Sequence, residues 1–186
     1  MAGLASTQEK RPYLGKDDRK RALLGAAAEL VEEEGWGILN MTALAERAGV
    51  SRQLVYQHFP NLEGLLSETA WAIFTDTMEG TAKAIADHPD NLKKAIRAAV
   101  FVSLDMPEGR GDALWQLIAG FGLHSPELEV IRAGIRDVIL KLWVPAVSKE
   151  LGLDKPAAYQ AALACFGVCS CLSWVYFLLK KPVQPR

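Results

Sequence analysis

The sequence has little of what catalysis or metal binding requires. Its 186 residues include three histidines and three cysteines, and neither residue type recurs at a spacing typical of a metal site. There is no glycine-rich phosphate loop and no nucleophile paired with a base. We therefore expect neither enzymatic activity nor a bound metal or cofactor.

Signals for export and for disulfide bonding are also missing. The N-terminus lacks the apolar stretch of a signal peptide, so we expect a cytoplasmic protein. Cys165, Cys169 and Cys171 lie in one apolar helical segment, where disulfides between them would have unsuitable geometry. They are either small buried residues in a reducing compartment or a thiol-based sensor of redox state or metal.

Strand-like alternation of apolar and polar residues is absent too. Half of the residues are hydrophobic, and they recur at helical spacing, which predicts an all-α protein. Beyond residue 61 we expect helices over residues 62–86, 92–105, 112–123 and 126–151, and a last helix from about residue 156 to 180. Pro145 is expected to kink the fourth of these five.

The most informative segment is residues 40–59, NMTALAERAGVSRQLVYQHF. Asn40 suits the N-cap of one short helix, and Ser51 suits the N-cap of a second. Gly49 stands between them, where the chain must take a positive φ that glycine adopts without strain. Two short helices around such a turn form a helix-turn-helix, whose second helix enters the DNA major groove.

The second helix carries polar side chains that suit DNA. Arginine can read guanine and glutamine can read adenine in the major groove, whereas tyrosine and histidine can donate to phosphates. The candidate DNA contacts are Thr42, Arg47, Arg52, Gln53, Leu54, Tyr56, Gln57 and His58. Arg19 and Lys20, at the start of an earlier helix that precedes both short helices, are further candidates.

Residues 35–66 resemble the DNA-binding domain of TetR-family regulators. Trp36, Asn40 and Leu44 hold the family's aromatic, threonine and isoleucine places. Direct matches are Ala45, Ala48, Gly49, Val50, Ser51, Tyr56, His58, Phe59 and Leu65. The resemblance implies a three-helix helix-turn-helix domain over residues 16–61 and a helical ligand-binding and dimerisation bundle over residues 62–186.

Two positions depart from the family pattern. Gln53 replaces a small residue at the tip of the second helix, where an amide either contacts a base or changes how deeply the helix docks. Leu62 replaces a lysine that meets a phosphate. Some of the phosphate contact must therefore come from elsewhere in this chain.

The N-terminal cations are one source of such contact. The net charge of −1 rules out a generic polyanion binder, yet basic residues crowd the start of the chain. Residues 1–15 are either a flexible basic arm that touches DNA or a solvated tail. The acidic cluster of Glu29, Glu32, Glu33 and Glu34 is expected to face away from DNA.

The family resemblance also implies a pocket for a small-molecule effector, enclosed by the helices after residue 61. Aromatic and apolar candidates suggest an apolar or aromatic ligand, although each is also an ordinary core residue and His124 is also a candidate helix cap. The candidates are Trp71, Phe74, Met78, Phe101, Met106, Trp115, Phe121, His124, Trp143 and Trp174. The helix over residues 62–86 is expected to transmit ligand binding to the DNA-binding domain.

The last helix has two interpretations. Residues 157–179 carry no charge, which suits either a membrane span or a helix buried between two copies of the chain. The resemblance implies that the last two long helices form a homodimer interface. The residues expected to allow close approach there are Ala161, Ala164, Cys165, Val168, Cys169 and Leu172.

These observations predict a transcriptional repressor that binds a palindromic operator as a homodimer. Two recognition helices must lie roughly 34–36 Å apart to enter successive major grooves. A small apolar or aromatic ligand is expected to release the DNA. The alternatives are an activator, a ligand-independent DNA-binding regulator, and a membrane-anchored helical protein.

Overall fold

The computed structural model describes residues 15–119 and 126–165, and the regular structure within these ranges is helical. The all-α prediction is therefore confirmed. The elements are α1 (Lys16–Glu34), the short 3-10 helix η1 (Trp36–Ile38), α2 (Met41–Ala48), α3 (Arg52–His58), α4 (Leu62–Ala86), α5 (Leu92–Leu104), α6 (Glu108–Ala119) and α7 (Pro126–Leu151). A further helix begins at residue 155 and is described to residue 165.

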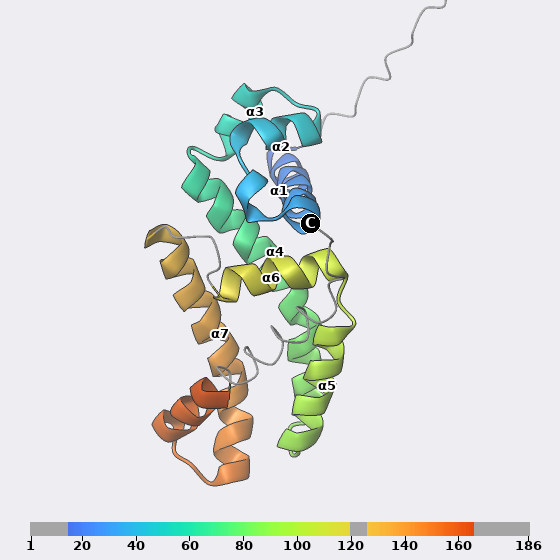
Figure 1. Cartoon of the computed structure of the whole chain (residues 1–186). Helices are drawn as coiled ribbons and strands as arrows, with labels where there is room; N and C mark the ends of the chain where they lie inside the picture. The colour runs from blue at the N-terminus through green and yellow to red at the C-terminus, as the bar shows by residue number, and fades with distance from the viewer. Residues whose placement is uncertain (1–14, 120–125, 166–186) are drawn as a thin grey trace, which may run out of the picture.

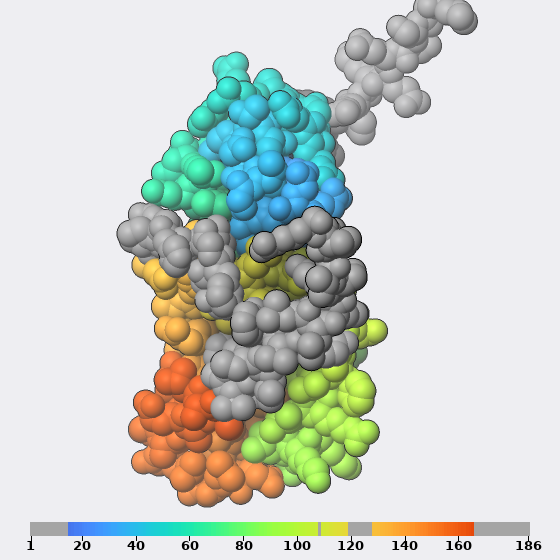
Figure 2. Space-filling model, viewed as in Figure 1, coloured from blue at the N-terminus to red at the C-terminus, as the bar shows by residue number. Residues whose placement is uncertain are grey.

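The helices form a head and a body that share one long helix. Figure 1 shows α1, α2 and α3 gathered at one end, with α4 running from that head into the body. Helix α6 crosses beneath the head, and α5 and α7 lie on either side of the lower half. The space-filling view shows the head as a rounded lobe at the top of an elongated molecule (Figure 2).

Short-range capping explains why the head helices begin and end where the sequence predicts. The Asn40 side chain accepts hydrogen bonds from the backbone N–H groups of Thr42 (2.9 Å) and Ala43 (3.0 Å). Ser51 Oγ accepts from the N–H of Leu54 at 3.2 Å. Gly49 adopts φ 62°, so the turn has the left-handed conformation expected of it. Each cap satisfies backbone donors that a helix leaves unpaired at its start.

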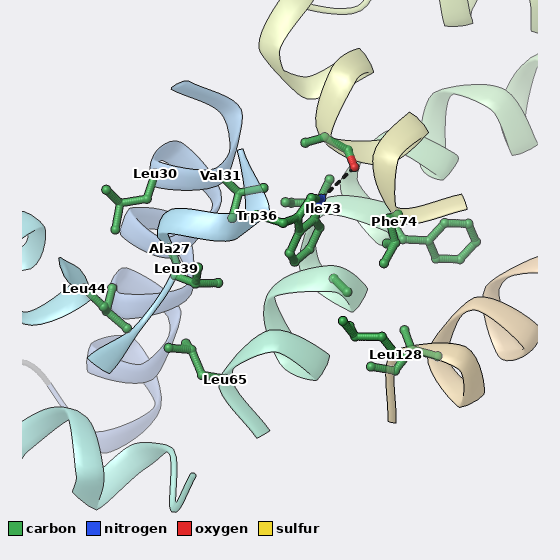
Figure 3. Close-up of a cluster of buried hydrophobic side chains, with 14 of the residues drawn as sticks. Ala27, Leu30, Val31, Trp36, Leu39, Leu44, Leu65, Ile73, Phe74 and Leu128 are labelled. Atoms are coloured by element: carbon green, nitrogen blue, oxygen red, sulfur yellow. Dashed lines mark hydrogen bonds between the residues drawn. The ribbon is translucent and has the colours of Figure 1, made fainter. Parts of the chain in front are cut away.

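One hydrophobic cluster joins the head to the body. Figure 3 shows Ala27, Leu30 and Val31 of α1 on one side of this cluster, with Ile73 and Phe74 of α4 on the other. The same cluster includes Ala113, Leu114 and Leu117 of α6, and Leu128, Ile131, Ile135 and Ile139 of α7. Because the core is continuous, the predicted boundary at residue 61 does not separate two independent cores.

The helix predicted over residues 112–123 starts earlier than predicted, so its predicted start at residue 112 is wrong. Helix α6 begins at Glu108, because Pro107 stands just before the helix and its carbonyl accepts from the N–H of Gly111 at 3.0 Å. Proline is tolerated at a helix start, where its missing N–H would be unpaired anyway. Helix α7 has the predicted bounds and continues through Pro145.

Candidate nucleic-acid interface

Helix α3 has one side buried in the head and a polar side that is exposed. Val55 and Phe59 are fully buried in the head core, and they hold the helix against its neighbours. Arg52, Gln53 and Gln57 are exposed. Tyr56 is 47% exposed, although tyrosine has a large apolar ring. The structure therefore brings four of the predicted DNA-contacting residues together on one accessible surface.

The remaining candidates on α2 and α3 are less accessible. Leu54 and Thr42 are half-buried. The backbone N–H of Thr42 is already bound to the Asn40 cap. Both residues therefore border the exposed face and are not at its centre.

Arg47 is engaged with α1 through ion pairs. Its Nη1 donates to Glu33 Oε1 at 3.0 Å, Nη2 contacts the other Glu33 oxygen, and Nη1 lies 3.8 Å from Glu29. The hydrogen bond from Arg47 lowers the pKa of the Glu33 carboxyl and raises the pKa of Arg47 itself. Arg47 thus fastens α2 to the acidic end of α1.

The acidic end of α1 is used within the protein. Glu32 accepts from Arg110 Nε at 2.7 Å, which links α1 to α6. The same guanidinium lies 3.8 Å from Asp76 of α4. The sequence showed an acidic cluster, but it held no signal for the partner of Glu32, because Arg110 lies 78 residues further along the chain.

Lys20 also has a structural role. Its Nζ lies 2.6 Å from Glu68 Oε2 of α4 and 5.7 Å from the centre of the Phe59 ring. A cation above an aromatic face is attracted by the ring's quadrupole. The residue therefore joins α1 to α4 and to the end of α3, and its charge is already paired with a carboxylate.

His58 lies beside the basic start of α1. Its Nδ1 is buried without a hydrogen-bond partner. Burial lowers the pKa of His58, and the charges of Lys16, Lys20 and Arg19 lower it further. The ring is therefore neutral near pH 7. The effect of Lys16 on His58 arises only when the helices pack, so the sequence alone held no signal for it.

Leu62 leaves the first position of α4 without a positively charged side chain. It is the first residue of α4 and is 43% exposed. The adjacent Asn61 caps the helix by accepting from Gly64 N–H at 2.8 Å. An apolar side chain at this place offers no donor to a phosphate.

The predicted ligand-pocket residues are divided between core and surface. Phe74 is buried and meets Trp71 edge to face, with ring centres 5.6 Å apart. Met78 and Trp143 are half-buried against the core. Trp115 is half-buried, with an indole N–H that has no acceptor. Phe121, His124 and Trp174 lie outside the described residues.

Phe101 is the most exposed of the described candidates. It is 57% exposed, and the Arg97 guanidinium lies 5.6 Å from its ring centre. A surface depression of about 460 Å³ is lined by Phe101, Val102, Leu104 and Asp105. Met106 follows this stretch and is half-buried. Of the described candidates, Phe101 is among the residues that line this depression.

Of the predicted dimer residues, three fall in the described part of the last helix. Ala161 is half-buried against a small cluster that includes Leu140 and Val147 of α7. Ala164 is exposed, and Cys165 is an exposed free thiol. Val168, Cys169 and Leu172 lie outside the described residues, as does Cys171.

The membrane interpretation receives no support from the described helices. Within residues 15–119 and 126–165, none is long and apolar enough to cross a bilayer.

Comparison with known proteins identifies relatives of this head and of the whole chain. Residues 23–69 match the family model described as bacterial regulatory proteins, tetR family. The HTH-type transcriptional activator FasR of Mycolicibacterium smegmatis is 27% identical, over 94% of this chain and 86% of that protein. The regulator BetI of Stenotrophomonas maltophilia is 28% identical, over 59% of this chain and 57% of its own length.

Solved structures show the same fold across most of the chain. A TetR-family regulator from Rhodococcus sp. superposes with a TM-score of 0.70 at 20% identity, covering 88% of this chain and 89% of that one. The fatty acid degradation regulator FadR from Bacillus halodurans has a TM-score of 0.62 at 17% identity, covering 92% and 90%. The similarity in fold therefore extends well beyond the head.

Proposed function

This chain is a DNA-binding transcriptional regulator of the TetR family, and we propose that it is a repressor whose homodimer binds a palindromic operator and is released by a small ligand. The observation that carries the proposal is the exposed face of α3, which holds Arg52, Gln53, Tyr56 and Gln57 above a buried anchor. Arginine and glutamine side chains read base edges, and tyrosine positions the helix on phosphates.

Dimerisation follows from the small size of this face. Helix α3 has seven residues, so one copy reads few base pairs. Exposed apolar residues on α7 favour a homodimer. Val130 and Val138 are both exposed, and Val130 is 73% exposed. Apolar side chains on the outer side of a long helix suit a homodimer interface. Two heads related by a two-fold axis require an inverted-repeat operator.

Ligand control acts through helices that pack against the head. Helix α4 passes from head to body, and α6 contributes Leu114 and Leu117 to the shared core. A ligand that binds better when these helices are displaced lowers DNA affinity by its difference in affinity for the two arrangements. The aromatic side chains of the body suit an apolar or aromatic ligand.

An activator is the second candidate function. The FasR protein, which is similar over most of this chain, is named a transcriptional activator. The same DNA contact serves either outcome, because the position of the operator relative to the promoter decides between them.

Selection from random duplexes tests the proposal without knowledge of the operator. The full chain should retain a duplex with two inverted half-sites, and footprinting should show two protected segments about one helical turn apart. Arg52→Ala should weaken this binding, whereas Arg136→Ala, at an exposed position on α7, should not. Failure to retain any duplex, or a single asymmetric half-site, contradicts the proposal. A transcription assay on the selected duplex then distinguishes repression from activation.

A further inference from the structure

Helix α5 carries large apolar side chains on its outer side. Ile96, Val100, Phe101 and Leu104 are between 44% and 57% exposed, and they are four of the ten large hydrophobic side chains that are exposed within residues 15–119 and 126–165. Ile96, Val100 and Leu104 are four residues apart, so they form one stripe along the helix. The solvent-facing side of a helix normally carries polar residues, whereas clustered apolar side chains mark an interaction site.

The inner side of the same helix explains why the fold leaves these side chains uncovered. Ala95 and Ala99 are buried and pack in a small cluster with residues of α4 and α7. Helix α5 also lies close to α4, since a Cβ added to Gly80 of α4 would be 3.2 Å from the Val102 side chain. The side turned toward α4 and α7 therefore uses small residues, and the large apolar ones lie on the side turned away from both helices.

Charged side chains mark the two ends of this outer side. Lys93, Lys94 and Arg97 are exposed in the first half of α5, and the Arg97 guanidinium lies 5.6 Å from the centre of the Phe101 ring. The residue that follows the helix is Asp105, which is exposed as well. The outer side is thus cationic at its start, apolar in its middle and acidic at its end.

This charge pattern is complementary to a second copy of itself in the antiparallel direction. Phe101 stands four residues after Arg97 and four residues before Asp105. A two-fold axis beside Phe101 places the Arg97 of each copy opposite the Asp105 of the other, and it brings the two Phe101 rings together. A parallel pairing would instead oppose like charges, which is unfavourable.

The surface depression at the end of α5 fits the same pairing. It is lined by Phe101, Val102, Leu104 and Asp105. In the antiparallel arrangement these residues face positions 97–101 of the second copy, so the Val100 side chain of that copy enters the depression. Side chains of one helix that fill hollows on another are the usual basis of helix packing.

The position of α5 separates this surface from the homodimer interface proposed above. Figure 1 shows α5 and α7 on either side of the lower body, and the proposed homodimer uses the α7 side. A contact through α5 therefore joins one dimer to another. Each copy contributes a helix of 13 residues, which is small beside the roughly 1,200–2,000 Å² of a stable interface. The contact is accordingly weak, and it forms at high local concentration.

We propose that the outer side of α5 is an antiparallel, two-fold interface between copies of this chain, through which one dimer associates with another. The inference goes beyond the DNA-binding function proposed above, because it concerns the protein without DNA. It rests on that proposal only in taking the dimer as the unit that associates.

Sedimentation equilibrium of the full chain, without DNA and over a range of concentrations, tests the interface. We expect the molecular mass to double reversibly as the concentration increases. Val100→Glu should abolish the doubling, because it places a carboxylate within the apolar stripe. Leu151→Glu, at an exposed position at the end of α7, should retain it.

The outcomes of this measurement separate the two proposals. A wild type that does not double in mass, or a Val100→Glu variant that doubles as the wild type does, overturns the α5 interface. Doubling from monomer to dimer that Val100→Glu abolishes supports the α5 interface and refutes the homodimer through α7. Failure to bind any duplex refutes the DNA-binding proposal and leaves the α5 interface intact.

The direction of the pairing is tested by exchanging charges. Arg97→Asp and Asp105→Arg should each weaken the association by roughly fivefold, because two symmetry-related ion pairs are lost at once. The double variant has the same opposite charges in reversed positions and should recover most of the wild-type association. A double variant as weak as the single ones overturns the antiparallel pairing. Melting curves of each variant show whether the fold is retained.

An anionic membrane is the competing occupant of this surface, because cations beside apolar side chains also suit lipid headgroups. The acidic Asp105 at the end of the stripe favours a second copy instead. Co-sedimentation with vesicles of phosphatidylserine and phosphatidylcholine distinguishes the two, and we expect the wild type to stay in solution. Vesicle binding that Val100→Glu abolishes, without any doubling in mass in solution, overturns the proposal.

Discussion

The indole N–H of Trp36 donates a hydrogen bond of 2.8 Å to the backbone carbonyl of Ala113, 77 residues further along the chain (Figure 3). Trp36 is the residue that follows the turn after α1, and Ala113 lies in the middle of α6. The bond is buried, so it joins the DNA-binding head to the body at a point from which water is excluded. The contact therefore fixes the position of α6 relative to the start of η1.

Trp36→Phe should lower the free energy of unfolding by about 1 kcal/mol, because phenylalanine retains most of the apolar volume and removes the donor. For a domain of this size, that corresponds to a fall of roughly 2–4 °C in melting temperature. Trp115→Phe is the matched control, since the Trp115 indole N–H has no acceptor to lose. Equal losses in the two variants would show that the Trp36 bond contributes nothing specific.

Gly109→Ala should destabilise the protein by about 1–3 kcal/mol, the usual range for overpacking. A Cβ on Gly109 would lie 2.3 Å from the backbone oxygen of Glu32, so α1 and α6 would have to separate. Gly25→Ala in α1 is the control: nothing lies within 4 Å of its Cβ, and alanine there should stabilise by about 0.5–1 kcal/mol. Thermal denaturation measures both, and a stabilising Gly109→Ala would contradict the close packing of the two helices.

The ion pair of Glu32 and Arg110 should show a coupling energy above that of an exposed pair. Both side chains are partly buried, and Arg110 also lies near Asp76. A double-mutant cycle with Glu32→Gln and Arg110→Gln measures the coupling. The exposed pair of Asp137 and Lys141 is the reference, for which about 0.3–0.5 kcal/mol is typical. No excess over this reference would mean that the α1–α6 pair is screened like a surface one.

Leu62→Lys should strengthen DNA binding. The substitution places a cation at the exposed start of α4, and one additional phosphate contact should steepen the salt dependence by about one unit of slope. Leu151→Lys, at an exposed position at the end of α7, adds the same charge away from the head. An equal gain from both variants would indicate a general charge effect, so the comparison decides whether position 62 faces the DNA backbone.

The stability of the free protein should fall as the pH drops below the ordinary pKa of histidine. The folded state holds His58 in its neutral form, because burial and the nearby cations lower its pKa, whereas the unfolded chain accepts the proton. Stability therefore increases with pH across this range. Melting curves between about pH 5 and pH 8 should be less pH-dependent in His58→Gln than in the wild type. An identical pH dependence would show that His58 does not titrate differently in the two states.

The helix boundaries of the head could be predicted from the sequence because their causes are local. Asn40 and Ser51 cap the helices through backbone groups two or three residues away, and Gly49 needs only its own φ to form the turn. The start of α6 could not be predicted in the same way. Proline and glycine usually interrupt helices, but here Pro107 precedes the first turn and Gly109 is needed where α6 touches α1.

The sequence by itself determined the helix-turn-helix and the polar face of α3, since both depend on the periodicity of a few adjacent residues. Only the tertiary structure decided how the charges are used. Arg47 and Lys20 are both predicted from the sequence to contact DNA, and packing places each beside a carboxylate of another helix. Ion pairs between helices depend on distances through space, and the order of residues along the chain does not specify those distances.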